Sequence, residues 1–223
     1  MPQQLAEFNP ADLAPIERYK LLVGCVTPRP IAWVSTRAPD GSVNLAPYSF
    51  FNAIGADPMT VLFCPATQPD GSEKDSLRNA KPEAEGGSGE FVVNVASESM
   101  IRHVAATGEE LPHGESEFEL AGLTEAPCAI VSAPRVAESP VAFECRTLEV
   151  VRTNGLKPGS GNVVIGEVVY AHVDRALIDE RLHVNADTLA TIGRMGGADY
   201  CRTRDRFALP RGRAALDPGT GNG

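Results

Sequence analysis

Short apolar runs separated by turn residues dominate this sequence and predict strands. The run at residues 31–36 is apolar on both faces, which is typical of a strand in the middle of a sheet or in the wall of a barrel. A glycine-rich stretch at 155–161 separates two long β-rich segments and predicts a hairpin loop; it lacks the ending of a phosphate-binding loop. The predicted strands lie at residues 31–36, 43–46, 59–64, 91–95, 141–151 and 163–173. A mainly β fold with peripheral helices follows from this pattern.

Helical segments are fewer and shorter than the predicted strands. Residues 13–26 predict a short helix or turn that packs residues 21–23 inward. Ser72 or Asp75 can cap a second helix, and Ser97 can begin a third, which has one apolar stripe. All three helices are expected to lie at the periphery of the sheet.

Three further segments carry no strand or helix pattern. Residues 82–89 are low in complexity and predict a mobile loop, and residues 108–123 are acidic and predict a surface excursion whose charges face solvent. The tail at 210–223 is rich in glycine, proline and alanine and predicts disorder. No domain boundary is visible, so residues 1–209 are expected to form a single domain.

Composition narrows the class of protein. The chain has 223 residues, of which 43% are hydrophobic and 22% charged, as in an ordinary globular protein. A formal net charge of −9 argues against nucleic-acid binding as the main activity. The N-terminus lacks the pattern of a signal peptide, and no segment is long and apolar enough to span a membrane, so we expect a cytoplasmic protein without membrane contact.

The cysteine and histidine residues are scattered along the chain. There are five cysteines and four histidines, and no Cys-x-x-Cys pair occurs among them. This predicts reduced thiols and no disulfide framework, and a metal site would need long-range convergence that the sequence does not indicate. There is also no Gly-x-Ser-x-Gly elbow, and no pair of acidic residues stands out, so no catalytic side chain can be assigned.

The segment from residue 44 to residue 52 contains more polar and aromatic groups than a core strand needs. Asn44, Ser49 and Asn52 can form hydrogen bonds, and three aromatic residues occur within four positions. Such a loop suits a planar ligand that has many heteroatoms. The alternative is a strand end whose aromatic rings fill the core and whose polar groups close a turn, and these nine residues alone do not decide between the two.

A second candidate site lies at the start of the helix after residue 71. Exposed backbone N–H groups there, with Lys74 and the Ser76 hydroxyl, can bind an anion. The alternative is that both side chains are only solvated residues at a helix start. A flat aromatic seat, polar groups for the ligand edges and a phosphate clamp are together the parts that an organic cofactor requires.

Several ordered motifs resemble those of the flavin reductase-like, FMN-binding split-barrel family, in the branch that includes flavoredoxin. The resemblance covers roughly residues 18–205. Its motifs lie at residues 27–36, 40–41, 44–52, 74–79, 91–95, 166–168 and 192–197, the last before Tyr200. Together these motifs are specific, although each alone would be weak.

The resemblance implies a six-stranded antiparallel split barrel that forms a homodimer and binds FMN near the subunit interface. It places the isoalloxazine against residues 47–52 and the phosphate around Arg29, Ser35, Thr36, Lys74 and Ser76, where the basic and hydroxyl groups suit phosphate oxygens. Arg194 and Tyr200 are candidates for the open face of the flavin. The full set of expected cofactor-binding residues is Arg29, Trp33, Ser35, Thr36, Asn44, Ala46, Pro47, Tyr48, Ser49, Phe50, Phe51, Asn52, Lys74, Asp75, Ser76, Arg194 and Tyr200.

The implied function is that of an oxidoreductase in which NADH or NADPH delivers a hydride to flavin N5. Electrons would then pass to an acceptor protein or monooxygenase, or reduced flavin would leave as a product. Two alternatives stay open: a non-catalytic FMN-binding electron carrier that is reduced by a partner protein, and a split-barrel protein that has lost flavin and binds another small molecule. The residues at 31–36, apolar on both faces, also favour the homodimer, because a barrel wall has only one interior side.

Overall fold

The computed structural model describes residues 3–112 and 115–216, and its centre is one seven-stranded antiparallel sheet. The order of its strands is β2-β1-β5-β8-β9-β4-β3. The mainly β, antiparallel prediction is therefore confirmed, with seven strands in the main sheet where six were expected. The strands are β1 (Ala32–Arg37), β2 (Val43–Tyr48), β3 (Phe51–Ala56), β4 (Met59–Phe63), β5 (Glu90–Val95), β8 (Val141–Arg152) and β9 (Asn162–Val173).

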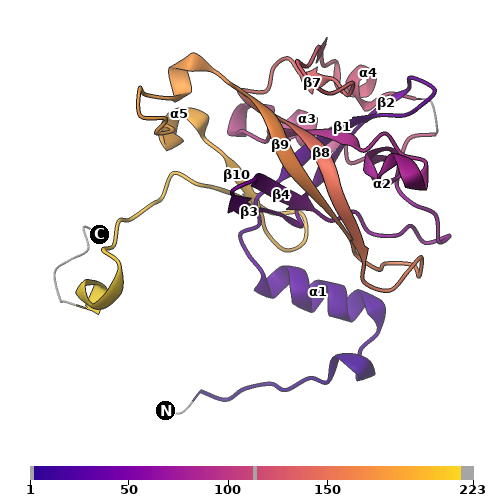
Figure 1. Ribbon diagram of the computed structural model, residues 1–223. Coiled ribbons are helices and arrows are strands. Elements are labelled where there is room, and N and C mark those ends of the chain that lie inside the picture. The colour runs from indigo at the N-terminus through magenta and orange to yellow at the C-terminus, as the bar shows by residue number, and fades with distance from the viewer. Residues whose placement is uncertain (1–2, 113–114, 217–223) are drawn as a thin grey trace.

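In the described part of the chain, two small hairpins and five α-helices accompany this sheet (Figure 1). The hairpins pair β6 (Glu125–Ala126) with β7 (Arg135–Val136), and β10 (Ile192–Arg194) with β11 (Tyr200–Arg202). The α-helices are α1 (Pro15–Cys25), α2 (Asp75–Ala80), α3 (Ile101–Ala106), α4 (Glu117–Ala121) and α5 (Ala186–Leu189). None of the helices in the described part of the chain has the length and apolar character needed to cross a membrane.

Strand β1 is buried on both faces, as its sequence predicts. One face contributes Ala32 and Val34 to a core cluster that also contains Phe63 and Phe91. The other face contributes Trp33 to a second cluster, which contains side chains from α3 and α4. The second face is thus covered within the chain, so the apolar character of this strand gives no argument for a dimer.

The long β8–β9 hairpin closes the interior around a glycine. Gly166 pairs with Val61 of β4 on one side and with Thr147 of β8 on the other. A Cβ atom at this position would lie 2.4 Å from the ring of Phe91, a distance at which something must shift. The Phe91 ring can therefore fill the core only where β9 has no side chain.

Helix α1 corrects an expectation about its packing. Val23 is buried, but Leu21 and Leu22 are 41% and 51% exposed, whereas all three were expected to pack inward. Figure 1 shows the reason, because α1 stands apart from the sheet and meets the rest of the chain mainly at its C-terminal end. This helix consequently presents apolar side chains on its surface.

Other segments differ from their predictions in local detail. Helix α2 begins at Asp75 with Lys74 as its N-cap residue, and no side chain caps it, whereas Ser72 or Asp75 was expected to do so. The loop expected to be mobile contains a 3-10 turn at Glu83–Glu85, and Ser88 and Gly89 donate backbone hydrogen bonds to the carbonyl groups of Asn79 and Lys81. In the tail, Gly212–Leu216 forms a 3-10 helix, and residues 217–223 lie outside the described residues.

Candidate functional site

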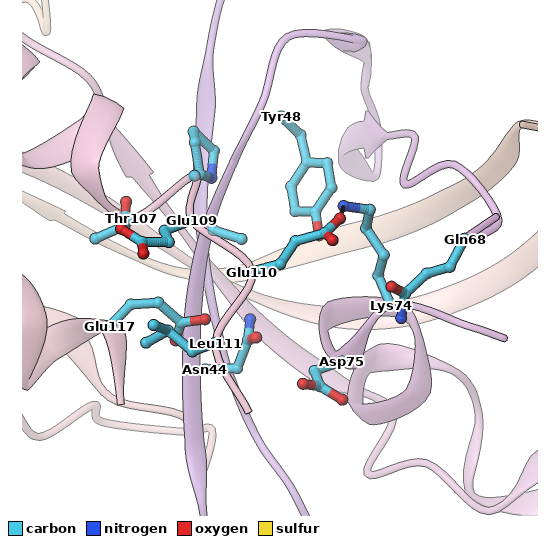
Figure 2. Close-up of a pocket in the computed structure, with 13 residues that line it drawn as sticks. Asn44, Tyr48, Gln68, Lys74, Asp75, Thr107, Glu109, Glu110, Leu111 and Glu117 are labelled. Carbon is cyan, nitrogen blue, oxygen red and sulfur yellow. Dashed lines mark hydrogen bonds and ion pairs between the residues drawn. The ribbon is translucent and has the colours of Figure 1, made fainter. Parts of the chain in front are cut away.

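A cavity of about 110 Å³ lies between β2, the start of α2 and the loop that follows α3 (Figure 2). Six of the expected cofactor-binding residues line it: Asn44, Ala46, Pro47, Tyr48, Lys74 and Asp75. Ser76 is 1% exposed, and its Oγ accepts a hydrogen bond of 2.8 Å from Asn44 Nδ2. The structure therefore brings together two segments that are distant in the sequence, and Ser76 joins them.

Tyr48 gives the cavity a neutral polar group on an apolar support. Its ring packs against Phe63 with centroids 5.2 Å apart. Burial raises the pKa of the Tyr48 phenol far above its ordinary value, and a hydrogen bond with Ser76 opposes this shift only in part. Tyr48 is therefore a phenol at every physiological pH and can donate a hydrogen bond, but it cannot supply a negative charge.

Lys74 is the cationic side chain of the cavity, and an acidic residue already contacts it. Its Nζ lies 3.2 Å from Glu110 Oε1, and the two side chains are 34% and 70% exposed. Figure 2 shows Glu110 extending across the cavity from the loop after α3. Because both side chains are partly solvated, the pair is weak, and an incoming anion can compete with Glu110 for Lys74.

Several residues of the cavity were not expected from the sequence. Gln68 belongs to the loop at 65–71, Thr107 precedes the acidic stretch at 108–123, and the others lie within that stretch, which was expected to face solvent. The unexpected lining residues are Gln68, Thr107, Gly108, Glu109, Glu110, Leu111 and Glu117. The loop after α3 thus forms one wall of the candidate site.

Glu117 shows where the surface prediction for residues 108–123 is wrong. This residue is only 6% exposed, and its Oε2 accepts a hydrogen bond of 2.9 Å from the backbone N–H of Leu45. Burial raises the pKa of Glu117, although the Leu45 hydrogen bond acts in the opposite direction. The contact fixes α4 against β2, behind the cavity.

Arg29 belongs to a second group of expected residues, centred on the turn between β2 and β3. Its side chain is buried and donates to the carbonyl oxygens of Val23, Val26 and Met195, at 2.7, 2.7 and 2.9 Å. Its Nε also donates to Ser49 Oγ at 3.3 Å. Arg29 therefore joins α1, the segment after β10 and the turn at Ser49, and does not line the cavity at Lys74.

Aromatic contacts complete this second group. The guanidinium of Arg29 lies 5.9 Å from the centroid of the Phe50 ring, and that of Arg194 lies 4.5 Å from the centroid of the Tyr200 ring. The backbones of Arg29 and Arg194 pair through two hydrogen bonds, of 3.0 and 2.8 Å. These expected residues are thus brought together, but at the β10–β11 hairpin instead of at the cavity.

Three expected residues are fully buried and have partners inside the protein. Trp33 Nε1 donates to Thr107 Oγ1 at 2.8 Å, and Thr36 Oγ1 accepts from Asn79 Nδ2 at 3.1 Å. The Ser35 hydroxyl donates to a backbone carbonyl oxygen of the loop before β7. The structure does not bring Ser35 or Thr36 to the surface of the cavity at Lys74, where phosphate contacts were expected.

Phe51 and Asn52 face a larger and more apolar part of the surface. Both line a hollow of about 580 Å³ over β3 and β4. A neighbouring hollow of about 340 Å³ runs along residues 28–31 and shares Pro30 and Phe51 with the first. The segment from Tyr48 to Phe51 therefore connects a small polar cavity with an extended apolar surface.

Comparison with known proteins identifies a family whose domain matches this chain, and several relatives that are similar to it in sequence. The flavin reductase like domain matches residues 23–192. An uncharacterized protein of Aquifex aeolicus is 39% identical over 184 residues, which are 82% of this chain and 89% of that protein. These matches confirm the resemblance drawn from the sequence motifs.

Two solved structures share both the fold and substantial sequence identity. Nitrilotriacetate monooxygenase component B from Bacillus cereus is 33% identical, with a TM-score of 0.86, over 93% of this chain and 100% of that one. The 2-nitrobenzoate 2-nitroreductase NbaA from Pseudomonas fluorescens is 31% identical, with a TM-score of 0.80, over 93% and 97%. A flavin reductase-like structure with a split barrel domain, from Shewanella frigidimarina NCIMB 400, has a TM-score of 0.76 at 21% identity, over 91% of this chain and 96% of that one. This likeness confirms the split-barrel fold expected from the sequence.

Proposed function

This chain belongs to the flavin reductase-like domain family, and on that premise we propose that it is an oxidoreductase that binds FMN and reduces it with NADH or NADPH. The observation that carries this proposal is the convergence of β2 and the start of α2 on one cavity, with Lys74 beside it. Support also comes from two relatives above 30% identity, which are a monooxygenase component and a nitroreductase.

The donor set of the cavity fits a phosphate group. Lys74 offers an ammonium group, and no side chain caps the N-terminus of α2. Ser76 is buried beneath Asn44 and Tyr48, so it contributes by holding these two side chains in place. A phosphate at this position would take the place of Glu110 beside Lys74.

The isoalloxazine ring needs more space than the cavity at Lys74 provides. A volume of about 110 Å³ is small compared with the roughly 300–1,000 Å³ of typical ligand sites. The ring would therefore extend along the segment from Pro47 to Phe51 toward the apolar hollows that meet at Pro30 and Phe51. Ser49 lies on this path, and because its oxygen accepts from Arg29, its O–H can donate to a polar edge of the ring.

The chemistry requires the protein to position the reactants more than to transfer protons. Bound FMN supplies N5 as the hydride acceptor. This chain would hold the phosphate at Lys74, support the ring on aliphatic and aromatic side chains, and exclude water at the apolar hollows. Alignment of two bound reactants supplies a large part of the rate acceleration in such reactions, which agrees with the absence of an obvious acid or base in the sequence.

A homodimer is part of the proposal, and exposed apolar residues support it. Ile16, Tyr19, Leu22 and Val26 of α1 and its C-terminal cap are all more than 50% exposed. Ile54 and Met59, beside the hollow over β3 and β4, are 50% and 44% exposed. Apolar surfaces of this kind usually mark an interface, and a second copy of the chain would enclose the open side of the ring site.

We further propose that a protein acceptor such as a monooxygenase receives the electrons, as the name of the Bacillus cereus relative suggests.

Substitution of Lys74 tests the proposed binding mode. Lys74→Ala should weaken FMN binding by about 1.5–3 kcal/mol, because a charge-assisted contact is lost. Riboflavin, which has no phosphate, should bind the variant as it binds the parent. Lys157→Ala, which removes an exposed lysine from the β8–β9 loop, is the matched control. Equal weakening of both flavins in the Lys74 variant would contradict the phosphate assignment.

A further inference from the structure

A cluster of three potential metal ligands lies away from the proposed flavin site. Glu144 of β8 pairs directly with Tyr170 of β9, and His172 of β9 pairs directly with Ala142 of β8. Glu144 and His172 are therefore diagonal neighbours on one face of the hairpin. Cys128 comes from the loop between β6 and β7. The sulfur of Cys128, a carboxylate oxygen of Glu144 and a ring nitrogen of His172 all lie within 4.8 Å of one another. Here the fold produces the long-range convergence that the spacing of these residues does not indicate.

Glu144 is oriented by the backbone and is fully buried. Its Oε1 accepts from the N–H of Ala129 at 2.7 Å, and its Oε2 accepts from Ile130 and Val131 at 2.7 and 3.0 Å. Three backbone donors therefore fix the carboxylate and keep it ionised. Supporting hydrogen bonds of this kind orient the ligands in established metal sites.

Two side chains also contact the Glu144 carboxylate, and each can release a proton when a metal cation binds in its place. His172 Nε2 lies 2.6 Å from Oε1, and the Cys128 thiol also hydrogen-bonds to Glu144. The imidazole and the thiol thus both contact the same carboxylate group. A divalent cation at the same position would satisfy all three groups without disturbing the backbone contacts.

We propose that Cys128, Glu144 and His172 form a binding site for Zn²⁺ that has three protein ligands and one open position. Sulfur, imidazole nitrogen and carboxylate oxygen are the ligand types that zinc takes in proteins. Bond lengths of 2.0–2.3 Å correspond to ligand separations of about 3.3–3.7 Å, so His172 Nε2 has to move away from Glu144 Oε1, which now lies at 2.6 Å, to admit the ion. The 27% exposed side chain of His172 gives the ion a route from solvent.

The binding of Zn²⁺ to these three residues can be written so that charge and protons are both conserved. Burial and the neighbouring Glu144 carboxylate raise the pKa of the metal-free Cys128 thiol to about 12, so Zn²⁺ itself has to displace this proton to solvent. His172 coordinates through Nε2 while its proton moves to Nδ1. The two negative ligands then neutralise the charge of Zn²⁺, and water completes the tetrahedral set. Because Cys128 leads into the loop that contacts Glu144, the ion would tie this loop to the β8–β9 hairpin.

Cobalt is the probe for this site, because Co²⁺ binds to zinc sites and absorbs light when a thiolate coordinates it. Chelator-treated full-length protein should bind one equivalent of Co²⁺ with a thiolate-to-metal absorption band, and Zn²⁺ should displace it. Cys128→Ser and His172→Gln should each lower the affinity at least tenfold. Cys25→Ser and His183→Gln, which remove an exposed thiol and an exposed histidine, should bind as the parent does.

Three results would overturn the proposal. These are the absence of saturable binding, an affinity in either the Cys128 or the His172 variant that equals that of the parent, and loss of the band in Cys25→Ser. Circular dichroism of each metal-free variant establishes that it is folded, and each of the two ligand variants decides the question without the other. A second readout is thermal unfolding, because saturating Zn²⁺ should raise the melting temperature of the parent but not of Cys128→Ser.

Discussion

At the scale of single residues, acidic side chains surround Lys74, the cationic side chain among the described residues that line the cavity. Asp75, Glu109, Glu110 and Glu117 line the same cavity. These carboxylates disfavour a phosphate, whereas Lys74 attracts it. The affinity for FMN should therefore depend on the balance between Lys74 and its acidic neighbours, and Glu110, which contacts Lys74 directly, is the residue that most clearly sets it.

Glu110→Gln should strengthen FMN binding by up to about fivefold, because an exposed ion pair of this kind is worth about 0.2–1 kcal/mol. Riboflavin binding should not change, since only the phosphate competes with Glu110. Fluorescence titration of both flavins measures the effect, and Glu149→Gln, at an exposed position on β8, serves as the control. Weaker FMN binding in the Glu110 variant would show that this carboxylate helps the ligand instead of competing with it.

Some of the expected residues meet in one cavity, whereas others are held elsewhere by buried partners that no local motif indicates. Asn44, Tyr48 and Lys74 are together in one cavity, as the motifs implied. Ser35 belongs to an equally clear motif, but its hydroxyl bonds to the loop before β7, a partner about 100 residues away that no local pattern reveals. Glu117 stood in an acidic stretch, and its burial against Leu45 depends on the packing of α4.

At the scale of elements, α4 stabilises the open edge of the main sheet. Strand β2 is the last strand on its side, and the Leu45 N–H that would otherwise be unpaired donates to Glu117. Edge strands of native proteins are commonly protected by such cover. Glu117 therefore contributes a backbone contact, but its ionised form carries a desolvation cost.

The pKa of Glu117 predicts how stability varies with pH. Burial raises this pKa in the folded protein above its value in the unfolded chain, so folding favours the protonated form. The associated stability is present below the unfolded pKa and is lost as the pH rises through the folded pKa. Glu117→Gln should thus melt at a higher temperature than the parent at pH 7, with the difference shrinking toward pH 4. Thermal unfolding of the flavin-free proteins tests this, and a difference independent of pH would contradict it.

Six of the seven strands of the main sheet were predictable from sequence because alternating or continuous apolar runs report burial directly, as in β1, β5 and the β8–β9 hairpin. Strand β3 was not predicted, because most of its residues are exposed. The short helices were less predictable. Helix α1 has apolar residues at positions 21–23, but a pattern of hydrophobicity cannot tell a face that meets the core from one that faces outward. The loop at 82–89 is rich in glycine, and its order comes from backbone bonds to α2 and its C-cap, which composition does not reveal.

At the scale of the whole molecule, the apolar surface of α1 should be an interface between two copies of the chain. Leu22→Glu places a charge on this surface and should convert the dimer to a monomer, because a buried unpaired charge is costly. Leu120→Glu, at an exposed position of α4, is the matched control and should leave the dimer intact. Light scattering at micromolar concentration measures both. A parent protein that is already monomeric would contradict the proposed dimer.

Anaerobic titration of the FMN-loaded protein with NADH, and separately with NADPH, followed by absorbance, tests the proposed function most directly. A flavin reductase should show the spectrum of bound oxidised flavin, and one equivalent of at least one nicotinamide nucleotide should bleach it. Steady-state oxidation of the same nucleotide should follow when FMN and oxygen are supplied. A protein that binds no FMN, or that holds FMN which neither nucleotide reduces, would contradict the assignment of this chain as a flavin reductase.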